Sequence, residues 1–351
     1  MSTKETGREN IHKAFTMLIV QEEFKLFYIL MGNLSEYHNL QSKSQFYNCI
    51  TINTEQEFET AFNHIKATSK DYVFRSVNEA KFKLYSSAQR QWIWNDLSNE
   101  YPSYKDYINS FIVNVQSHQH IVSFFHNNHI PLNDFVILSL LQHYSQPSPL
   151  VDFTYNPLLS LFFAFDNVKP GTTGNEIDNY VSLYRLKYTH PCFCSIQDVN
   201  VHGADTLSDA LRNLNIPLAQ IDTSKVLFDI QNLTYNEYAD IGIMLVHGDK
   251  MGITNIQIPA LGFTCTYNIT NPNLRNQEGL FMLNTTEDIP LEDLIRRKHR
   301  HVDPLIDCYN INKELGTYIR ATYLDPAGIN HSLIYPQDKD SQNLRNWLGG
   351  F

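Results

Sequence analysis

The chain has 351 residues, of which 42% are hydrophobic and 13% aromatic, so it can bury a large core and long disordered tracts are not expected. Its 37 acidic and 27 basic side chains give a formal net charge of -10, and this negative field disfavours nucleic acid as a partner. Five cysteines, an odd number, and a start without a charged and then apolar leader favour a cytoplasmic location.

The first predicted element is an amphipathic helix over residues 11–31, where apolar side chains recur at helical spacing until Gly32 and Asn33 end it. We assign residues 1–48 to an N-terminal helical extension and residues 49–351 to one large domain. The extension is expected to dock on that domain or on a second copy of the chain, and the sequence leaves both alternatives open.

A short strand is predicted over 50–52, a capped helix over 54–68 and a second strand over 71–76. In the second strand Arg75 shares a face with Val73 and Val77. An arginine on an apolar face is costly to bury without a partner, and its planar fork suits a carboxylate or a phosphate. A structural salt bridge and a ligand contact both remain open for Arg75.

The stretch from residue 80 to residue 144 has mostly helical patterns, with helices expected around Trp92, over 104–125 and over 135–144. Four histidines in this stretch carry no neighbouring carboxylate and do not share one helical face, so no metal site is expected. The Cys192 and Cys194 pair lacks a second pair at zinc-site spacing, which leads to the same expectation.

The most informative stretch, residues 141–166, predicts a short strand over 151–154 followed by a buried helix over 158–165. Asn156 is expected to cap the helix and Pro157 to occupy its first position, where its missing N–H costs nothing. The apolar run is far shorter than the roughly 20 residues that span a bilayer, so no membrane association is expected.

Asp152 and Thr154 lie on the same face of the predicted 151–154 strand, beside the start of the buried helix. Small polar groups at this place can bind a ligand. They can equally satisfy amide groups of the turn and the helix cap, and the sequence supports both interpretations.

The C-terminal half is richer in strands, and a basic cluster at 296–301 is expected in the last turn of a helix, where cations complement the helix dipole. We expect an α+β fold, with a mixed or antiparallel sheet around the buried helix 158–165 and a helical insertion between the first and second motif strands. The remaining predicted elements are strands over 180–188, 241–246, 253–266 and 277–283 and helices over 206–214 and from 312 to 325, with Gly328 as a stop.

Several of these stretches resemble the FRG domain family, named after a Phe-Arg-Gly motif. The resemblance covers about residues 50 to 336, and the order of its patterns is more specific than any single one. Its motifs correspond to Phe74-Arg75-Ser76, with serine in place of the glycine; to Gln142-His143-Tyr144, Leu150 to Thr154, Asn156-Pro157-Leu158 and Phe162-Phe163-Ala164; to Arg275, Gln277, Gly279 and Phe281; and to Gly328-Ile329 and Ile334-Tyr335-Pro336.

Three features in chain order also resemble, more weakly, those of ADP-ribosyltransferases: Arg75 on a strand, the 151–154 strand before the buried helix, and the polar stretch at Gln277. In ADP-ribosyltransferases these three features are a strand arginine, a hydroxyl-bearing strand before a helix, and a late glutamate. This resemblance implies NAD as the candidate substrate. Cleaving the bond between nicotinamide and ribose builds positive charge on the ribose, and an anion placed beside the ribose stabilises that charge. The resemblance implies the following roles: Arg75 binds phosphate or the adenosine ribose, Asp152 and Thr154 hold the nicotinamide ribose, and His143 and Tyr144 line the pocket.

The third of these features departs from the ADP-ribosyltransferase pattern, because Gln277 stands where a glutamate is usual. In a strand Glu278 would face away from Gln277, so either Asp152 supplies the charge, a loop turns Glu278 inward, or the reaction has been lost. The catalytic candidates are therefore Asp152, Gln277 and Glu278, and the cofactor-binding candidates are Arg75, His143, Tyr144 and Thr154.

Two further hypotheses remain open from the sequence. In one, the same cleft belongs to a binding module for a nucleotide or a protein partner, without chemistry, in a bacterial or phage regulatory or defence system. In the other, Arg75 and Asp152 form an internal ion pair. The oligomeric state is left undetermined.

Overall fold

The computed structural model describes residues 34–127, 132–144, 146–168, 174–187, 235, 243–248, 253–258, 263–268, 277–299, 305–335 and 339–349. The helices predicted over 11–31 and 206–214 and the pair Cys192 and Cys194 lie outside these residues. The boundary drawn at residue 48 stays a prediction, although Tyr37, Lys43 and Tyr47 are buried in the core of the structure.

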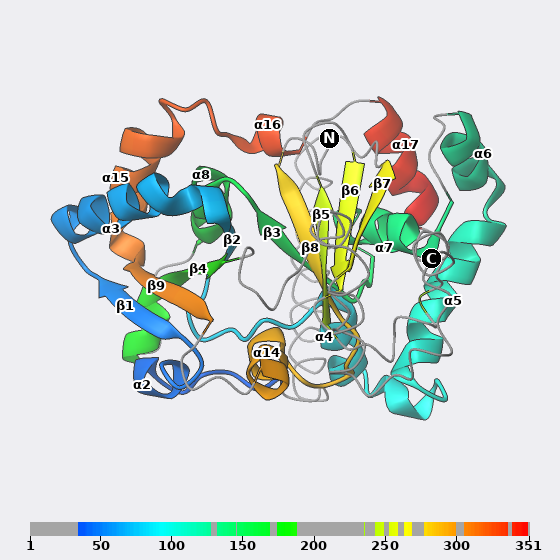
Figure 1. Cartoon of the computed structure of the whole chain (residues 1–351), viewed down its shortest axis with the longest axis horizontal. Helices are drawn as coiled ribbons and strands as arrows, with labels where there is room; N and C mark the ends of the chain where they lie inside the picture. Colours follow the sequence, from blue (N-terminus) through cyan, green and yellow to red (C-terminus); the bar gives the residue numbers. More distant parts are fainter. Residues whose placement is uncertain are drawn as a thin grey trace, which may run out of the picture.

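Within the described residues, nine strands form one mixed sheet in the order β1-β9-β4-β2-β3-β8-β5-β6-β7 (Figure 1). The β1–β9 pair is parallel, and the other pairs are antiparallel. The strands are β1 (Asn48–Ile52), β2 (Tyr72–Val77), β3 (Leu150–Thr154), β4 (Tyr180–Lys187), β5 (Ile243–Gly248), β6 (Ile253–Ile258), β7 (Phe263–Asn268), β8 (Gly279–Asn284) and β9 (Ile306–Asn312).

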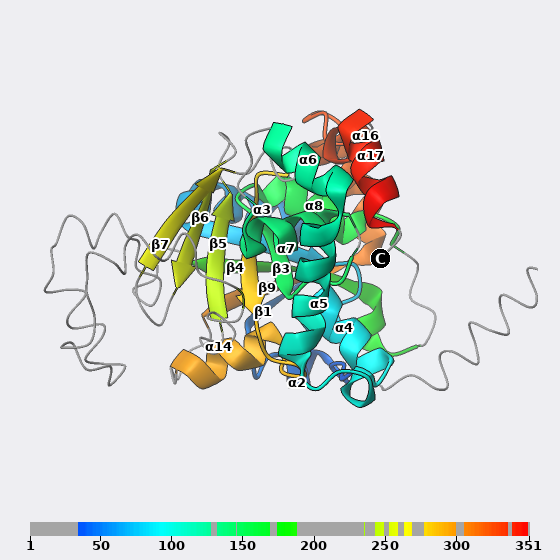
Figure 2. The ribbon, with the colours of Figure 1, turned by 90° about the vertical axis from the view of Figure 1, so that its right-hand side faces the viewer.

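Helices cover both faces of the sheet, which confirms the α+β class (Figures 1 and 2). Four of these helices follow β2 and precede β3 in the sequence, which confirms the helical insertion. The helices are α2 (Leu40–Lys43), α3 (Glu55–Thr68), α4 (Ser87–Trp94), α5 (Tyr104–Ser117), α6 (Gln119–Asn127), α7 (Asp134–His143), α8 (Pro157–Phe165), α14 (Leu291–His299), α15 (Gly316–Ile319), α16 (His331–Ile334) and α17 (Lys339–Leu348).

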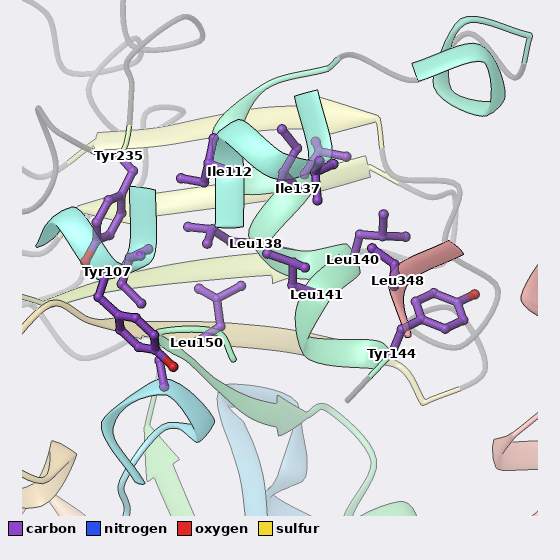
Figure 3. Packing of buried hydrophobic residues seen from close by; sticks show 14 of the residues in the cluster. Tyr107, Ile112, Ile137, Leu138, Leu140, Leu141, Tyr144, Leu150, Tyr235 and Leu348 are labelled. Atoms are coloured by element: carbon purple, nitrogen blue, oxygen red, sulfur yellow. The ribbon is translucent and has the colours of Figure 1, made fainter. Parts of the chain in front are cut away.

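Three hydrophobic clusters follow from this arrangement. One joins α3, α8 and the 315–334 segment to one face of the sheet, and a second joins α14 and the 37–47 segment to the opposite face. The third packs α4 to α7 and α17 against β3 and β8 (Figure 3). The sheet is therefore covered on both faces around β2 and β3, where the predicted site residues lie.

The central helix α8 starts as its sequence predicts. The Asn156 side chain accepts a hydrogen bond from the Leu158 N–H at 2.9 Å, and Pro157 occupies the first turn. Seven of its nine residues are buried, but Leu158 and Phe163 are half-buried, so protein does not surround the helix on every side as expected. Phe163 is free to form part of a cleft wall.

Three predicted elements are corrected by the structure. The helix expected over 104–125 is two helices, because His118 adopts an extended backbone between α5 and α6. The strand expected over 253–266 is the antiparallel pair β6 and β7. The strand expected over 277–283 begins at Gly279, since Glu278 has a left-handed backbone with φ of 45° that interrupts the extended chain.

A polar cluster lies under α14, on the face of the sheet opposite α8. The Lys43 ammonium is buried, and it donates to the Ala80 carbonyl at 2.8 Å and the Asn310 side chain at 3.0 Å. The Glu292 carboxyl accepts hydrogen bonds from the Tyr37 hydroxyl and the Leu84 N–H. Burial raises the pKa of Glu292 more than these hydrogen bonds lower it.

This burial predicts a pH-dependent stability difference for Glu292→Gln. A carboxyl group whose folded pKa is raised stabilises the fold fully below its unfolded pKa, near 4.5, and loses that contribution as pH rises through the folded pKa. Glutamine mimics the protonated carboxyl and cannot titrate. We therefore expect the free energy of unfolding of Glu292→Gln, relative to wild type, to increase from pH 4.5 toward neutrality.

Urea unfolding at a series of pH values measures this difference. Glu314→Gln, at an exposed glutamate, is the matched control and should follow the wild-type pH profile. A constant difference between Glu292→Gln and wild type over this pH range would contradict a raised pKa at Glu292.

Candidate functional site

The site is organised around the junction between β2 and β3. β2 pairs with β4 along its whole length but pairs with β3 only between Phe74 and Thr154. Beyond that pair the two strands diverge, so the main chain of β3 is open to a side chain from β2. Arg75 occupies this position.

Arg75 holds the two strands together through its guanidinium. Its Nη1 donates to the Asp152 main-chain oxygen at 2.6 Å and lies 3.7 Å from the Asp152 carboxylate. Its Nε is buried and has no hydrogen-bond partner among the described residues. Burial lowers the pKa of Arg75, and the neighbouring Asp152 opposes that shift.

The other residues of the Phe74-Arg75-Ser76 motif attach β2 to α8. Phe74 is buried in the same cluster as the helix, and the Ser76 hydroxyl lies 2.7 Å from the Ser160 hydroxyl. Ser76, which replaces the glycine of the motif, therefore has a hydrogen-bonding role in this chain.

Asp152 is also held from the helical insertion. The Gln142 side chain donates to its carboxylate at 2.7 Å and accepts from the Ser87 hydroxyl at 3.1 Å. The Asp152 side chain is 40% exposed, so this carboxylate is restrained on one side and open on another. Gln142 belongs to the Gln-His-Tyr motif but was not predicted as a site residue; its signal was a polar side chain at the end of an apolar helix.

Thr154, at the end of β3, and Gln277, just before β8, contact each other. The Thr154 hydroxyl donates to the Gln277 carbonyl at 2.7 Å and accepts from the Asn156 N–H at 3.1 Å. Both side chains are buried. Thr154 thus has the cap and turn contacts that one interpretation of the sequence anticipated.

Glu278 lies in the turn before β8, so the strand alternation used to orient it does not apply. Its Oε1 accepts a hydrogen bond from the Asn156 side chain at 3.2 Å, and its carbonyl accepts from the Tyr155 N–H at 3.0 Å. The turn therefore brings Glu278 to the N-terminal end of α8, beside Thr154.

His143 and Tyr144 end α7 and lie among apolar side chains. The His143 ring packs 5.4 Å from the Phe281 ring, and burial lowers its pKa although Asp152 opposes the shift. Tyr144 is buried in the cluster of the helical insertion, near Leu348 (Figure 3). Neither residue lines the cleft that Arg75 borders.

That cleft has a volume of about 1290 Å³ and is lined in part by the C-terminal end of β2, from Arg75 to Val77. Among the described residues that line it, Arg75 is the one predicted site residue. Two other lining residues, Arg90 and Trp94 of α4, were not predicted, because nothing in their local pattern indicates which face of α4 borders a cleft. The remaining lining residues include Tyr85, Phe163, Asp166 and Tyr335.

These features define an α+β protein with a mixed sheet, whose central strand pair carries an arginine and carboxylate contact, with the arginine at the wall of a cleft. The family model of the FRG domain matches residues 70–172, from the turn before β2 to just after α8, and this part of the chain is an FRG domain. The downstream motifs from Arg275 to Pro336 lie outside the matched residues. Searches of curated proteins and of solved structures give no match.

Two general findings bear on the class of site. Across the described ranges, no cluster of three or more His, Cys, Asp or Glu side chains has an arrangement that could hold a metal ion. No described helix is long and apolar enough to cross a membrane.

Proposed function

We propose that the cleft beside Arg75 binds NAD and that the protein uses NAD for ADP-ribosyl transfer or NAD cleavage. The observation that carries the proposal is the Arg75 guanidinium, which borders the cleft with an unpartnered, buried Nε within the described structure. Charge-assisted hydrogen bonds from an arginine fork to phosphate are among the strongest polar contacts in proteins.

Asp152 is the carboxylate best suited to the reaction in this proposal. When the bond between ribose and nicotinamide breaks, its electron pair leaves with nicotinamide and the ribose becomes oxocarbenium-like until water or an acceptor attacks and loses a proton. A negative charge beside the ribose stabilises that transition state. Asp152 does not line the cleft itself, but its side chain is 40% exposed and lies 3.7 Å from Arg75, which does. Each carboxylate accepts one hydrogen bond from a side-chain amide, Asp152 from Gln142 and Glu278 from Asn156.

Thr154, Gln277, His143 and Tyr144 have supporting roles in this proposal. The hydrogen bond between Thr154 and Gln277 supports the turn that carries Glu278, and Glu278 is a carboxylate at the N-terminal end of α8. His143 packs against Phe281 and Tyr144 lies in the core of the helical insertion, so both stabilise the end of α7 that carries Gln142. A ribose contact at Thr154 would require the ligand to reach a buried hydroxyl that already donates its hydrogen to Gln277.

Calorimetric titration of the full chain with NAD tests the proposal. We expect Arg75→Ala to weaken NAD binding at least tenfold, because the loss of one charged hydrogen-bonding group costs about 1.5 to 3 kcal/mol. Arg320→Ala, at an exposed arginine away from the cleft, is the charge-matched control and should bind as wild type does.

Thermal unfolding of both variants must first show a folded protein, since Arg75 also joins β2 to β3. NAD binding that is equal in wild type and Arg75→Ala would refute the proposed site. Nicotinamide release, followed by chromatography, then tests the reaction, and Asp152→Asn should slow it while leaving NAD binding within a few-fold of wild type.

A non-catalytic module for a nucleotide or a protein partner is the second candidate. It is favoured by the internal hydrogen bonds of Thr154, Glu278 and Asp152, which engage these predicted polar groups within the fold. NAD binding without nicotinamide release would select this alternative. The proposed setting, the cytoplasm of a bacterium or phage-infected cell in a regulatory or defence system, rests on the resemblance to the FRG domain family.

A further inference from the structure

A second arginine, Arg90, borders the same cleft as Arg75. It lies in the first half of α4, whose N-terminus has a capping box made by Ser86 and Gln89. Gln89 also donates to the Thr286 and Ile289 carbonyls at 2.8 and 2.9 Å, which fixes α4 against the segment after β8. Arg90 therefore approaches the cleft from a rigid element.

A hydrogen-bonded chain connects α4, the helix that carries Arg90, to Arg75. Ser87 of α4 bonds to Gln142, Gln142 to Asp152, and Asp152 to Arg75. Burial and the charge of Arg75 lower the pKa of Arg90 to about 10, while Asp152 opposes the shift. An arginine guanidinium stays protonated at neutral pH, so the two side chains carry like charges that repel each other.

The cleft is lined by four basic side chains, Arg75, Lys81, Lys83 and Arg90, and by three acidic ones, Glu36, Asp166 and Asp178. Arg90 makes one hydrogen bond, to the Tyr85 carbonyl at 2.9 Å, and the described residues give it no carboxylate within salt-bridge distance. Asp152 is the shared counter-charge, at 3.7 Å from Arg75. Since a guanidinium offers five N–H donors, both arginines retain donors for an anionic ligand.

The rest of the wall suits the apolar part of such a ligand. Trp94, one helical turn after Arg90, borders the cleft together with Tyr85 and Tyr335. Ligand pockets typically combine aromatic walls with a few convergent polar groups, and stacking on an aromatic ring accepts any base. The volume of about 1290 Å³ is large enough for a dinucleotide.

We propose that Arg75 and Arg90 together form a diphosphate-binding site, which selects nucleotides that carry two linked phosphates, with Trp94 as the aromatic surface for the base. One arginine would bind each phosphate group, and the dianion would relieve the repulsion between the two guanidinium groups. This inference rests on the proposed nucleotide cleft and adds the ligand class and a second binding residue.

Calorimetric titration of the full chain with ADP, AMP and adenosine tests the inference. We expect ADP to bind at least tenfold more tightly than AMP, and adenosine to give no measurable heat. In Arg90→Ala the difference between ADP and AMP should fall to about twofold. Arg90→Lys should recover only part of it, because lysine keeps the charge but not the bidentate fork.

Arg320→Ala serves again as the matched control, and thermal unfolding shows whether Arg90→Ala is folded. If Arg90→Ala did not fold, Trp94→Ala would replace it, and a loss of affinity shared by ADP and AMP is expected from the lost stacking surface. Equal affinity of wild type for ADP and AMP, or an unchanged ADP affinity in a folded Arg90→Ala, would overturn the inference.

These outcomes differ from those that test the proposed function. ADP binding that depends on Arg90, together with no nicotinamide release from NAD, supports the diphosphate site and refutes the reaction. NAD binding that depends on Arg75 but not on Arg90 supports the proposed NAD site and refutes the diphosphate inference.

Discussion

Leu161→Ala is expected to lower the free energy of unfolding by about 2 to 5 kcal/mol, the usual cost of removing three carbons from a close-packed core. Leu161 lies in the middle of α8 and is fully buried among side chains of β2, β4, α3 and the 315–334 segment. Few neighbours can move to fill the cavity, because elements from distant parts of the chain meet there. Urea unfolding followed by circular dichroism measures the change.

Leu158→Ala is the matched control in the same helix. Leu158 is half-buried, so the same substitution should cost about 1 kcal/mol or less. If both variants lost the same stability, the cost would come from the helix itself and not from the packing of Leu161.

Arg185→Ala is expected to destabilise the fold by about 3 kcal/mol. Arg185 stands opposite Asp307 in the β4 and β9 register and donates to its carboxylate at 3.0 and 2.7 Å. The guanidinium also stacks 4.2 Å from the centre of the Tyr72 ring. Removing one partner of a buried ion pair costs roughly 3 to 5 kcal/mol, and we take the lower end because Asp307 is 25% exposed.

Arg297→Ala provides the comparison for that prediction. Arg297 pairs with Asp293 at 3.0 Å on the surface of α14, where the two side chains are 58% and 28% exposed. Exposed pairs of this kind contribute about 0.5 kcal/mol or less. Thermal unfolding of the two variants should therefore separate them clearly, and a similar small change in both would show that burial adds nothing to the Arg185 pair.

A large loss of stability in Arg75→Ala, without nucleotide binding in the wild type, would also be informative. If Arg75→Ala lost several kcal/mol of stability while wild type bound no nucleotide, the arginine would serve only to join the diverging strands β2 and β3. That result would select the internal ion-pair hypothesis, which the contact with Asp152 allows.

The sequence by itself determined the elements whose signals are local. The cap at Asn156, Pro157 at the first turn and the apolar run to Phe165 predict α8 because each acts within a few residues. The strand around Arg75 and its two faces follow from the period of two in an extended chain, and the structure confirms them. The helical insertion was predicted in the same way from apolar spacing.

Only the tertiary structure decided which side chains meet. Arg75 contacts Asp152 because β2 and β3 diverge after one pair, and no local pattern encodes where two strands part. Glu278 turns toward α8 because its backbone is left-handed, which an extended-strand argument cannot anticipate. Arg90 borders the cleft because Gln89 anchors α4 to residues almost 200 positions later in the chain. Contacts of such long sequence separation depend on the packing of the whole domain, and so the site, unlike its elements, required the fold.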